Sequence, residues 1–230
     1  MNIESEQFKI RQAVQKLHRR YRKNPWIFMT EADIQCSLYA TLIHSHLSKP
    51  KRAIVRDRYG EKLKNKVNIS TIPVHAELSY TERRKTKFVD LCLIDPSEFI
   101  FLIRKTKTIA EKKRFPITNW HWDTQRTIGI EIKINYGVSK DSLDPQANRN
   151  WQIFKERLVV DLKKLKIYKR GWLILVDHQS TFSNKKEWRK FAIDIIRRSN
   201  PKKSKKLINA YYLSPSTGTA WSYKAPGSSF

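Results

Sequence analysis

One stretch of the chain, residues 127–135, constrains the fold more than any other, because apolar and polar side chains alternate along it. Every second residue is an isoleucine: Ile128, Ile130, Ile132 and Ile134. Successive side chains of a β-strand point to opposite faces, so the residues between the isoleucines share the other face. A shift of register by one residue would bury Glu131 and Lys133 in place of the isoleucines. The pattern therefore predicts a strand in fixed register that holds an acid and a base side by side.

A second apolar segment, residues 88–94, predicts another strand, and it contains a single carboxylate, Asp90. An unpaired charge in such a segment is costly. If the two strands are neighbours, roughly 4.8 Å apart, Asp90 and Glu131 converge on one point. Two carboxylates that close remain ionised together only with a cation between them. Oxygen ligands of this kind suit Mg²⁺, with Mn²⁺ as the alternative.

The order Asp90, then Glu131-Ile132-Lys133, resembles the PD-(D/E)XK nuclease superfamily, the group of restriction endonucleases, Holliday junction resolvases and recombination nucleases. Val89 stands where the motif has its proline. The resemblance extends from about residue 30 to about residue 213. It implies an α/β fold with a restriction-endonuclease-like core, in which a central mixed β-sheet is flanked by helices on both faces. The alternative is a surface pair of Glu131 and Lys133 on a half-buried strand, with Asp90 capping a turn.

The resemblance also implies roles for these residues. Asp90 and Glu131 would be ligands of Mg²⁺, and the carbonyl of Ile132 would be a third ligand. Lys133 would orient or deprotonate the attacking water and offset charge in the transition state.

Two further glutamates are candidates for the same site. The sequence 30–33 predicts a capping box with Thr30 as the N-cap of a helix, and Glu31 lies on the inward side of that helix. The first core helix of the superfamily commonly contributes a glutamate, and Glu31 resembles it, although acids also favour a first helical turn through the helix dipole. Glu77 is open to two interpretations, a metal ligand from a neighbouring strand or an ion-pair partner of Arg83 or Arg84.

Charge indicates the partner. The chain has 47 Lys and Arg against 21 Asp and Glu, a formal charge of +26, so a polyanion is expected. The residues expected to contact DNA are basic side chains in predicted helices, turns and irregular stretches: Arg19, Arg20, Arg22, Lys51, Arg52, Arg56, Arg83, Arg84, Lys163 and Lys164.

The remaining composition excludes several classes of protein. The six glycines form no phosphate-binding loop, which excludes a P-loop NTPase and a Rossmann dinucleotide site. Cys36 and Cys92 lack the spacing of zinc ligands and are expected to be buried free thiols. No apolar run has the length of a membrane span and no signal peptide follows Met1, so we expect no membrane partner and a soluble, cytoplasmic protein.

Periodicity predicts the elements of one domain, residues 1–230. Helices are expected near residues 5–23, 30–47, 151–166 and 184–198, and strands near 67–78, 88–94, 127–135, 171–176 and 207–213. Within the domain we expect an N-terminal basic helix in residues 1–25, an insertion at 96–126 and a loosely held tail at 214–230.

These features predict a metal-dependent DNA endonuclease. Its partner is DNA, with a homodimer or a partner protein of a larger DNA-processing complex left open. Two alternatives also stay open: a junction resolvase, a transposon-end nuclease subunit or an RNA-directed member with the same chemistry, and an inactive nucleic-acid-binding module of the same fold. A basic structural protein would have no reason to place two carboxylates and a lysine on the polar faces of core strands.

Overall fold

The computed structural model describes residues 3–44, 51–52, 54–57, 70–71, 73–82, 85–94, 99–103, 117–122, 127–138, 143–168, 170–199 and 207–224. Four α-helices occur in these ranges: α1 (Ile3–Lys23), α2 (Glu31–Leu42), α4 (Pro145–Lys164) and α5 (Lys185–Ser199). Two short 3₁₀ turns, η1 (Pro25–Ile27) and η5 (Leu165–Ile167), follow α1 and α4. None of these helices is long and apolar enough to cross a membrane.

The centre of the molecule is a six-stranded sheet in the order β11-β10-β9-β8-β5-β4. Its strands are β4 (Val74–Glu82), β5 (Lys85–Leu93), β8 (Ile128–Asn135), β9 (Arg170–Asp177), β10 (Leu207–Leu213) and β11 (Trp221–Tyr223). The sheet is mixed, because β9 is parallel to β8 and β10 whereas the other neighbours are antiparallel. The predicted α/β class with a central mixed sheet is thus confirmed.

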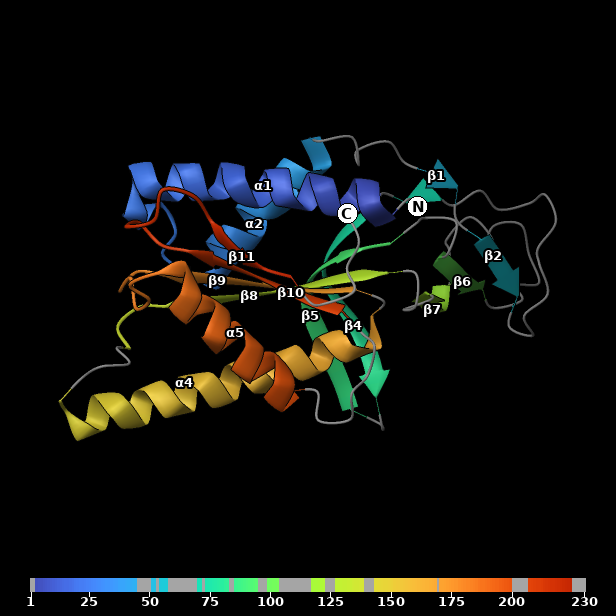
Figure 1. Ribbon diagram of the computed structural model, residues 1–230. Coiled ribbons are helices and arrows are strands. Elements are labelled where there is room, and N and C mark those ends of the chain that lie inside the picture. The colour runs from blue at the N-terminus through green and yellow to red at the C-terminus, as the bar shows by residue number, and fades with distance from the viewer. Residues whose placement is uncertain are drawn as a thin grey trace.

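Helices cover both faces of this sheet (Figure 1). The four isoleucines of β8 belong to the core under α1 and α2, as the alternation predicted. The opposite face packs against α4 and α5 through side chains such as Leu173 and Leu175 of β9. β9 is buried on both faces because it lies inside the sheet and between two helical layers, which is why its sequence is continuously apolar.

Two glycines bring α4 close to the sheet. Gly129 of β8 and Gly171 of β9 are paired in register. A Cβ on Gly129 would lie 2.5 Å from a ring carbon of Tyr168, and one on Gly171 would lie 2.9 Å from Cβ of Leu165. The absence of both side chains lets the end of α4 and the residues after it pack directly on the strands.

The end of the chain differs from the prediction. Residues 214–224 are not loosely held, because β11 pairs with β10 and Thr217 and Ala220 are buried. The His18 ring of α1 also donates through Nε2 to the Ser214 carbonyl at 3.0 Å. Aromatic and apolar residues within a Ser- and Gly-rich segment supply this anchoring; residues 225–230 lie outside the described part.

The predicted insertion at 96–126 contains two strands, β6 (Phe99–Ile103) and β7 (Ile117–Trp122). They pair with each other and with β2 (Ile54–Asp57) in a separate three-stranded sheet. β1 (Lys51–Arg52) and β3 (Ser70–Thr71) form a further short pair. Strands therefore occur inside the predicted insertion, where β6 pairs with β2 from about 45 residues earlier in the sequence.

Predictions about helix ends and cysteine burial were correct in some places and wrong in others. Helix α4 begins at Pro145, six residues before the predicted start at 151, with Asp144 as its N-cap. Both cysteines are free, but only Cys92 is buried, whereas Cys36 is exposed on α2. The capping box of Thr30 and Asp33 is present as predicted.

Candidate active site

The candidate site lies where β5 and β8 separate. Their ladder runs from Leu93 opposite Ile128 to Leu91 opposite Ile130 and ends there. One step further, the Asp90 carboxylate inserts between the strands and accepts the backbone N–H of Ile132 at 2.6 Å. The Gln35 side chain of α2 donates to the Asp90 carbonyl at 2.8 Å. The break in pairing therefore opens a gap in the sheet that polar groups occupy.

Burial perturbs both carboxylates of this gap. Glu131 is fully buried, and Asp90 is partly buried. Desolvation raises the pKa of Asp90, against the opposing effects of the Ile132 N–H and nearby lysines. Desolvation, followed by the charge of Asp90, raises the pKa of Glu131 to about 9. The two acids predicted to converge are thus close enough to interact through their charges.

Helix α4 supplies two groups that contact the acids. Lys164 Nζ lies 3.2 Å from Glu131 Oε2 and 2.8 Å from Asp161 Oδ1. Lys164 was predicted to contact a nucleic-acid backbone, but here it is directed at the buried glutamate. Asp161 was not predicted at all. A signal for it existed in the sequence, since it follows Leu158 by three residues and precedes Leu165 by four, which places an acid on the inward face of the helix.

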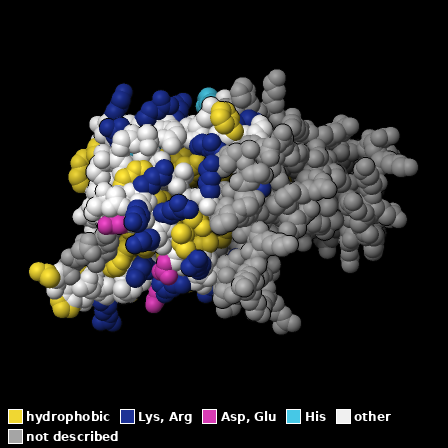
Figure 2. Space-filling model, in the orientation of Figure 1, with side chains coloured by type: hydrophobic (Ala, Val, Ile, Leu, Met, Phe, Trp, Pro, Cys, Tyr) yellow, Lys and Arg dark blue, Asp and Glu magenta, His cyan; other side chains and the backbone are white. Residues whose placement is uncertain are grey.

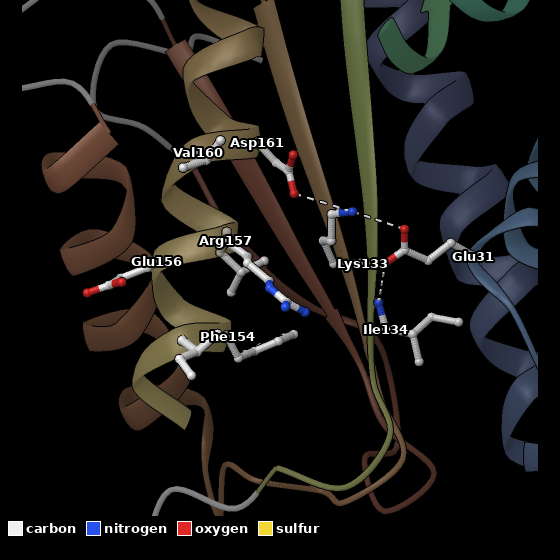
Figure 3. A pocket seen from close by; sticks show the side chains of 10 residues that line it. Glu31, Lys133, Ile134, Phe154, Glu156, Arg157, Val160 and Asp161 are labelled. Carbon is white, nitrogen blue, oxygen red and sulfur yellow. Dashed lines mark hydrogen bonds and ion pairs between the residues drawn. The ribbon is translucent and has the colours of Figure 1, made fainter. Parts of the chain in front are cut away.

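Lys133 connects the two helical layers (Figure 3). Its Nζ lies 3.0 Å from Glu31 Oε2 of α2 and 3.3 Å from Asp161 Oδ2 of α4. Burial acts to lower the pKa of Lys133, but the charges of Asp161 and Glu31 outweigh it, so the pKa is raised. Lys133 is therefore held as an ammonium group. Glu31 also accepts the Ile134 N–H at 3.4 Å, which fixes its carboxylate against β8.

A pocket of about 390 Å³ opens beside this ion-pair network, between α4 and the end of β8. Glu31, Lys133 and Asp161 form its polar wall. Arg157 of α4 reaches across it towards β8 (Figure 3), and within the described ranges its guanidinium has no ion-pair partner. Among the described residues that line the pocket, Arg157 is thus a cation without an ion-pair partner next to the carboxylates.

Glu77 lies near the gap, but it takes no part in the ion pairs between described residues. The register of β4 and β5 places it opposite Asp90, and the ladder lacks a pair at this point. Its φ is 50°, in the left-handed region that is unfavourable for a side chain with a Cβ. The Glu77 side chain is exposed. Arg83 and Arg84, the predicted alternative partners of Glu77, lie outside the described residues.

The resemblance implies a divalent cation at this gap. No group of three or more His, Cys, Asp or Glu side chains in the described ranges is placed to hold a metal ion. The predicted set, however, consists of two carboxylates, Asp90 and Glu131, and the Ile132 carbonyl. Glu131 Oε1 is buried and has no hydrogen-bond partner among the residues that the structure describes. A buried acceptor of this kind beside a second carboxylate has the chemistry to hold a cation.

On the described part of the face shown in Figure 2, Lys and Arg greatly outnumber Asp and Glu. This basic surface is consistent with the predicted polyanionic partner. A groove of about 430 Å³ lies along α1 beside the end of α2, and Lys9, Arg11, Lys16 and Arg19 line it. Arg20 and Arg22 are exposed further along α1, and Lys163 is exposed on α4. Lys51, Arg52 and Arg56 lie in β1 and β2, but their side chains, like Arg83 and Arg84, are outside the description.

In comparisons with known proteins, no family model, no curated protein and no solved structure matches the chain.

Proposed function

We propose that this chain is a metal-dependent endonuclease that hydrolyses DNA phosphodiester bonds, with a restriction-endonuclease-like core of the PD-(D/E)XK type. The observation that carries the proposal is the buried Glu131, whose Oε1 has no partner among the described residues, beside Asp90 at the gap between β5 and β8. Lys133 follows Glu131 by two residues on the same strand. This combination of two acids and a lysine is what the resemblance requires.

A second buried acid in the same sheet differs from Glu131 in its hydrogen bonding. Asp177, at the end of β9, accepts from Tyr212 Oη at 2.7 Å and from Asn135 Nδ2 at 2.9 Å. It also accepts the backbone N–H groups of Gln179 and Thr181. Asp177 therefore has four donors for its two oxygens, as expected of a buried structural carboxylate. Within the described part of the chain, Glu131 has Lys164 on one oxygen and no partner on the other, which costs stability unless a ligand uses that oxygen.

In the proposed enzyme, Asp90, Glu131 and the Ile132 carbonyl hold Mg²⁺ or Mn²⁺. A cation bound there supplies Lewis-acid polarisation of the scissile phosphate. Lys133 cannot accept a proton while it is an ammonium, and the carboxylates of Glu31 and Asp161 keep it in that form. Its role is therefore to donate hydrogen bonds that orient the attacking water and offset the charge developing on the phosphate.

The substrate is assigned from charge. Phosphate contacts explain the excess of cations along α1, and the uncommitted Arg157 is positioned to bind a phosphate next to the carboxylates. Such contacts set affinity and orientation without selecting a base sequence. A junction resolvase or a transposon-end nuclease subunit would use the same residues on a different DNA structure.

The test is a cleavage assay with matched acidic variants. Purified protein is incubated with supercoiled, linear and branched DNA, with Mg²⁺ or with EDTA. Cleavage should require Mg²⁺ and should be lost in Asp90→Asn and Glu131→Gln, while Asp194→Asn, which changes an exposed acid on α5, should cleave normally. DNA binding, followed by gel shift, should persist in all three variants. Cleavage in EDTA, or full activity in either site variant, would refute the proposed function.

A further inference from the structure

Three aromatic rings form a stack at the end of the sheet next to the candidate site. The His178 ring stacks with Trp26 (centroids 5.9 Å apart, planes at 25°) and with Tyr136 (5.5 Å, 11°). Trp26 lies in η1, Tyr136 follows β8, and His178 follows β9. The end of α1 and the carboxyl ends of β8 and β9 lie on the same side of the molecule (Figure 1). Segments distant in sequence therefore contribute to one aromatic surface.

The Tyr136 and His178 rings are held in place, but the stack is not covered. Tyr136 Oη donates to the Met29 carbonyl, and Gln179 Nε2 donates to the Tyr136 carbonyl at 2.7 Å. The fully buried Tyr21 packs edge-on against His178. Yet Trp26 is 72% exposed and Tyr136 is 52% exposed. Large rings that are fixed in place and left open to solvent add little to folding and are typical of a binding surface.

This stack adjoins the groups proposed for catalysis. Tyr136 follows Lys133 by three residues, about 10 Å along an extended chain. Met29, which holds the Tyr136 hydroxyl, precedes Glu31 by two residues. A molecule lying on the rings would therefore reach the acidic gap as well.

Charge next to the stack specifies the class of partner. The last turn of α1, which leads through Asn24 into the turn of Trp26, carries Arg20, Arg22 and Lys23. Cations for phosphates beside open ring faces are the combination that binds single-stranded nucleic acid, since every base can stack on an aromatic face. A purely apolar protein partner would have no use for this positive charge.

We propose that the stack of Trp26, His178 and Tyr136 is a platform on which the protein stacks an unpaired nucleobase next to the phosphate that it cleaves. The inference rests on the proposed function, because it presumes that nucleic acid occupies the site. It adds that the substrate is locally unpaired, as at a junction, a flap or a flipped nucleotide, so fully paired duplex is the poorer ligand.

The experiment measures binding in EDTA by fluorescence anisotropy, so that cleavage plays no part. The probes are a labelled single-stranded DNA, the RNA of the same sequence, the DNA duplex, and the single strand with abasic positions. Trp26→Ala should weaken binding of the single strand roughly 5- to 160-fold, which corresponds to the loss of stacking on one base, and should change duplex and abasic binding less than about twofold. Trp26→Phe, which keeps an aromatic face, should recover most of the affinity.

Phe8→Ala is the matched control, because Phe8 is an exposed aromatic residue on α1 (55%) outside the stack. It should bind every probe as the wild type does, and thermal unfolding should show that all variants remain folded. If Trp26→Ala lost the same affinity for normal and abasic strands, or lost no affinity for any probe, the base-stacking platform would be wrong. The aromatic surface would then be assigned to a protein partner. Wild-type protein that binds the single strand in this manner but cleaves nothing with Mg²⁺ would refute the nuclease and keep the platform.

Discussion

Replacing Glu131 with glutamine should stabilise the protein at neutral and alkaline pH. The pKa of Glu131 is raised to about 9 in the folded protein, from an ordinary value of 4.5. Between these two values the folded protein keeps a proton that the unfolded chain releases. The free energy of unfolding therefore falls as the pH rises from 4.5 towards 9. Glutamine has nearly the same shape and does not ionise, so it removes this dependence.

The size of the effect follows from the difference between pKa and pH. Each pH unit above 4.5 removes about 1.4 kcal/mol of stability from the wild type, so about 4 kcal/mol is lost at pH 7.5. That figure is an upper limit, because an ionising buried carboxylate draws in water and neighbouring cations. For a chain of this size each kcal/mol shifts the midpoint of thermal unfolding by roughly 2–4 °C. Glu131→Gln should thus melt several degrees higher at pH 7.5 and within about 2 °C of the wild type at pH 5.

The assay is thermal unfolding followed by circular dichroism, in EDTA, at several pH values from 5 to 8. Glu156→Gln is the control, since Glu156 is an exposed acid on the wall of the same pocket, and its melting curve should follow the wild type throughout. Mg²⁺ should raise the melting temperature of the wild type but not of Glu131→Gln, because a ligand stabilises only the form that binds it. Two outcomes would refute the assignment of Glu131 as a buried carboxylate with a raised pKa: parallel plots of melting temperature against pH for the wild type and Glu131→Gln, or a variant that is less stable than the wild type at pH 8.

Four further outcomes are expected. Lys133→Ala should slow single-turnover cleavage at saturating enzyme about 100-fold or more, with DNA affinity nearly unchanged, because its ammonium acts on charge that develops in the transition state; a loss confined to gel-shift affinity would contradict this. Arg157→Ala should show the reverse, weaker binding in a gel-shift titration with the cleavage rate restored at saturating enzyme. A plot of log affinity against log salt for the wild type should fall steeply, by about 0.9 for each phosphate contact, and a flat plot would exclude a phosphate-binding surface. Gly129→Ala should lower the thermal stability by about 1–3 kcal/mol, because its Cβ would meet the Tyr168 ring, whereas Gly137→Ala, with nothing within 4 Å, should not.

Patterns of short period predicted much of this fold correctly. The isoleucines of β8 face one core as their spacing required, and α1, α5 and β10 begin and end within two residues of their predicted limits. Thr30 and Asp33 form the predicted capping box. Such features depend on a few neighbouring residues, whose geometry a strand or a helix imposes without reference to the remaining chain.

Errors occurred where a strand depends on a partner strand that its own residues do not reveal. The strand β11 in the supposedly loose tail exists because β10 offers it an edge, and β6 is paired with β2 across about 45 residues. Nothing local distinguishes an apolar stretch that finds such an edge from one that does not.

The candidate site also combines features predictable from local sequence with features that only tertiary packing produces. The sequence by itself determined that Glu131 and Lys133 share one face of a strand, and that Asp90 lies alone in an apolar strand, because alternation within a strand is a local property. Only the tertiary structure decided that β5 and β8 separate at Asp90, and that α4 brings Asp161 and Lys164 against Glu131 and Lys133. Those contacts depend on where a helix packs on a sheet, and close packing at Gly129 sets that position with no periodic signal in the sequence.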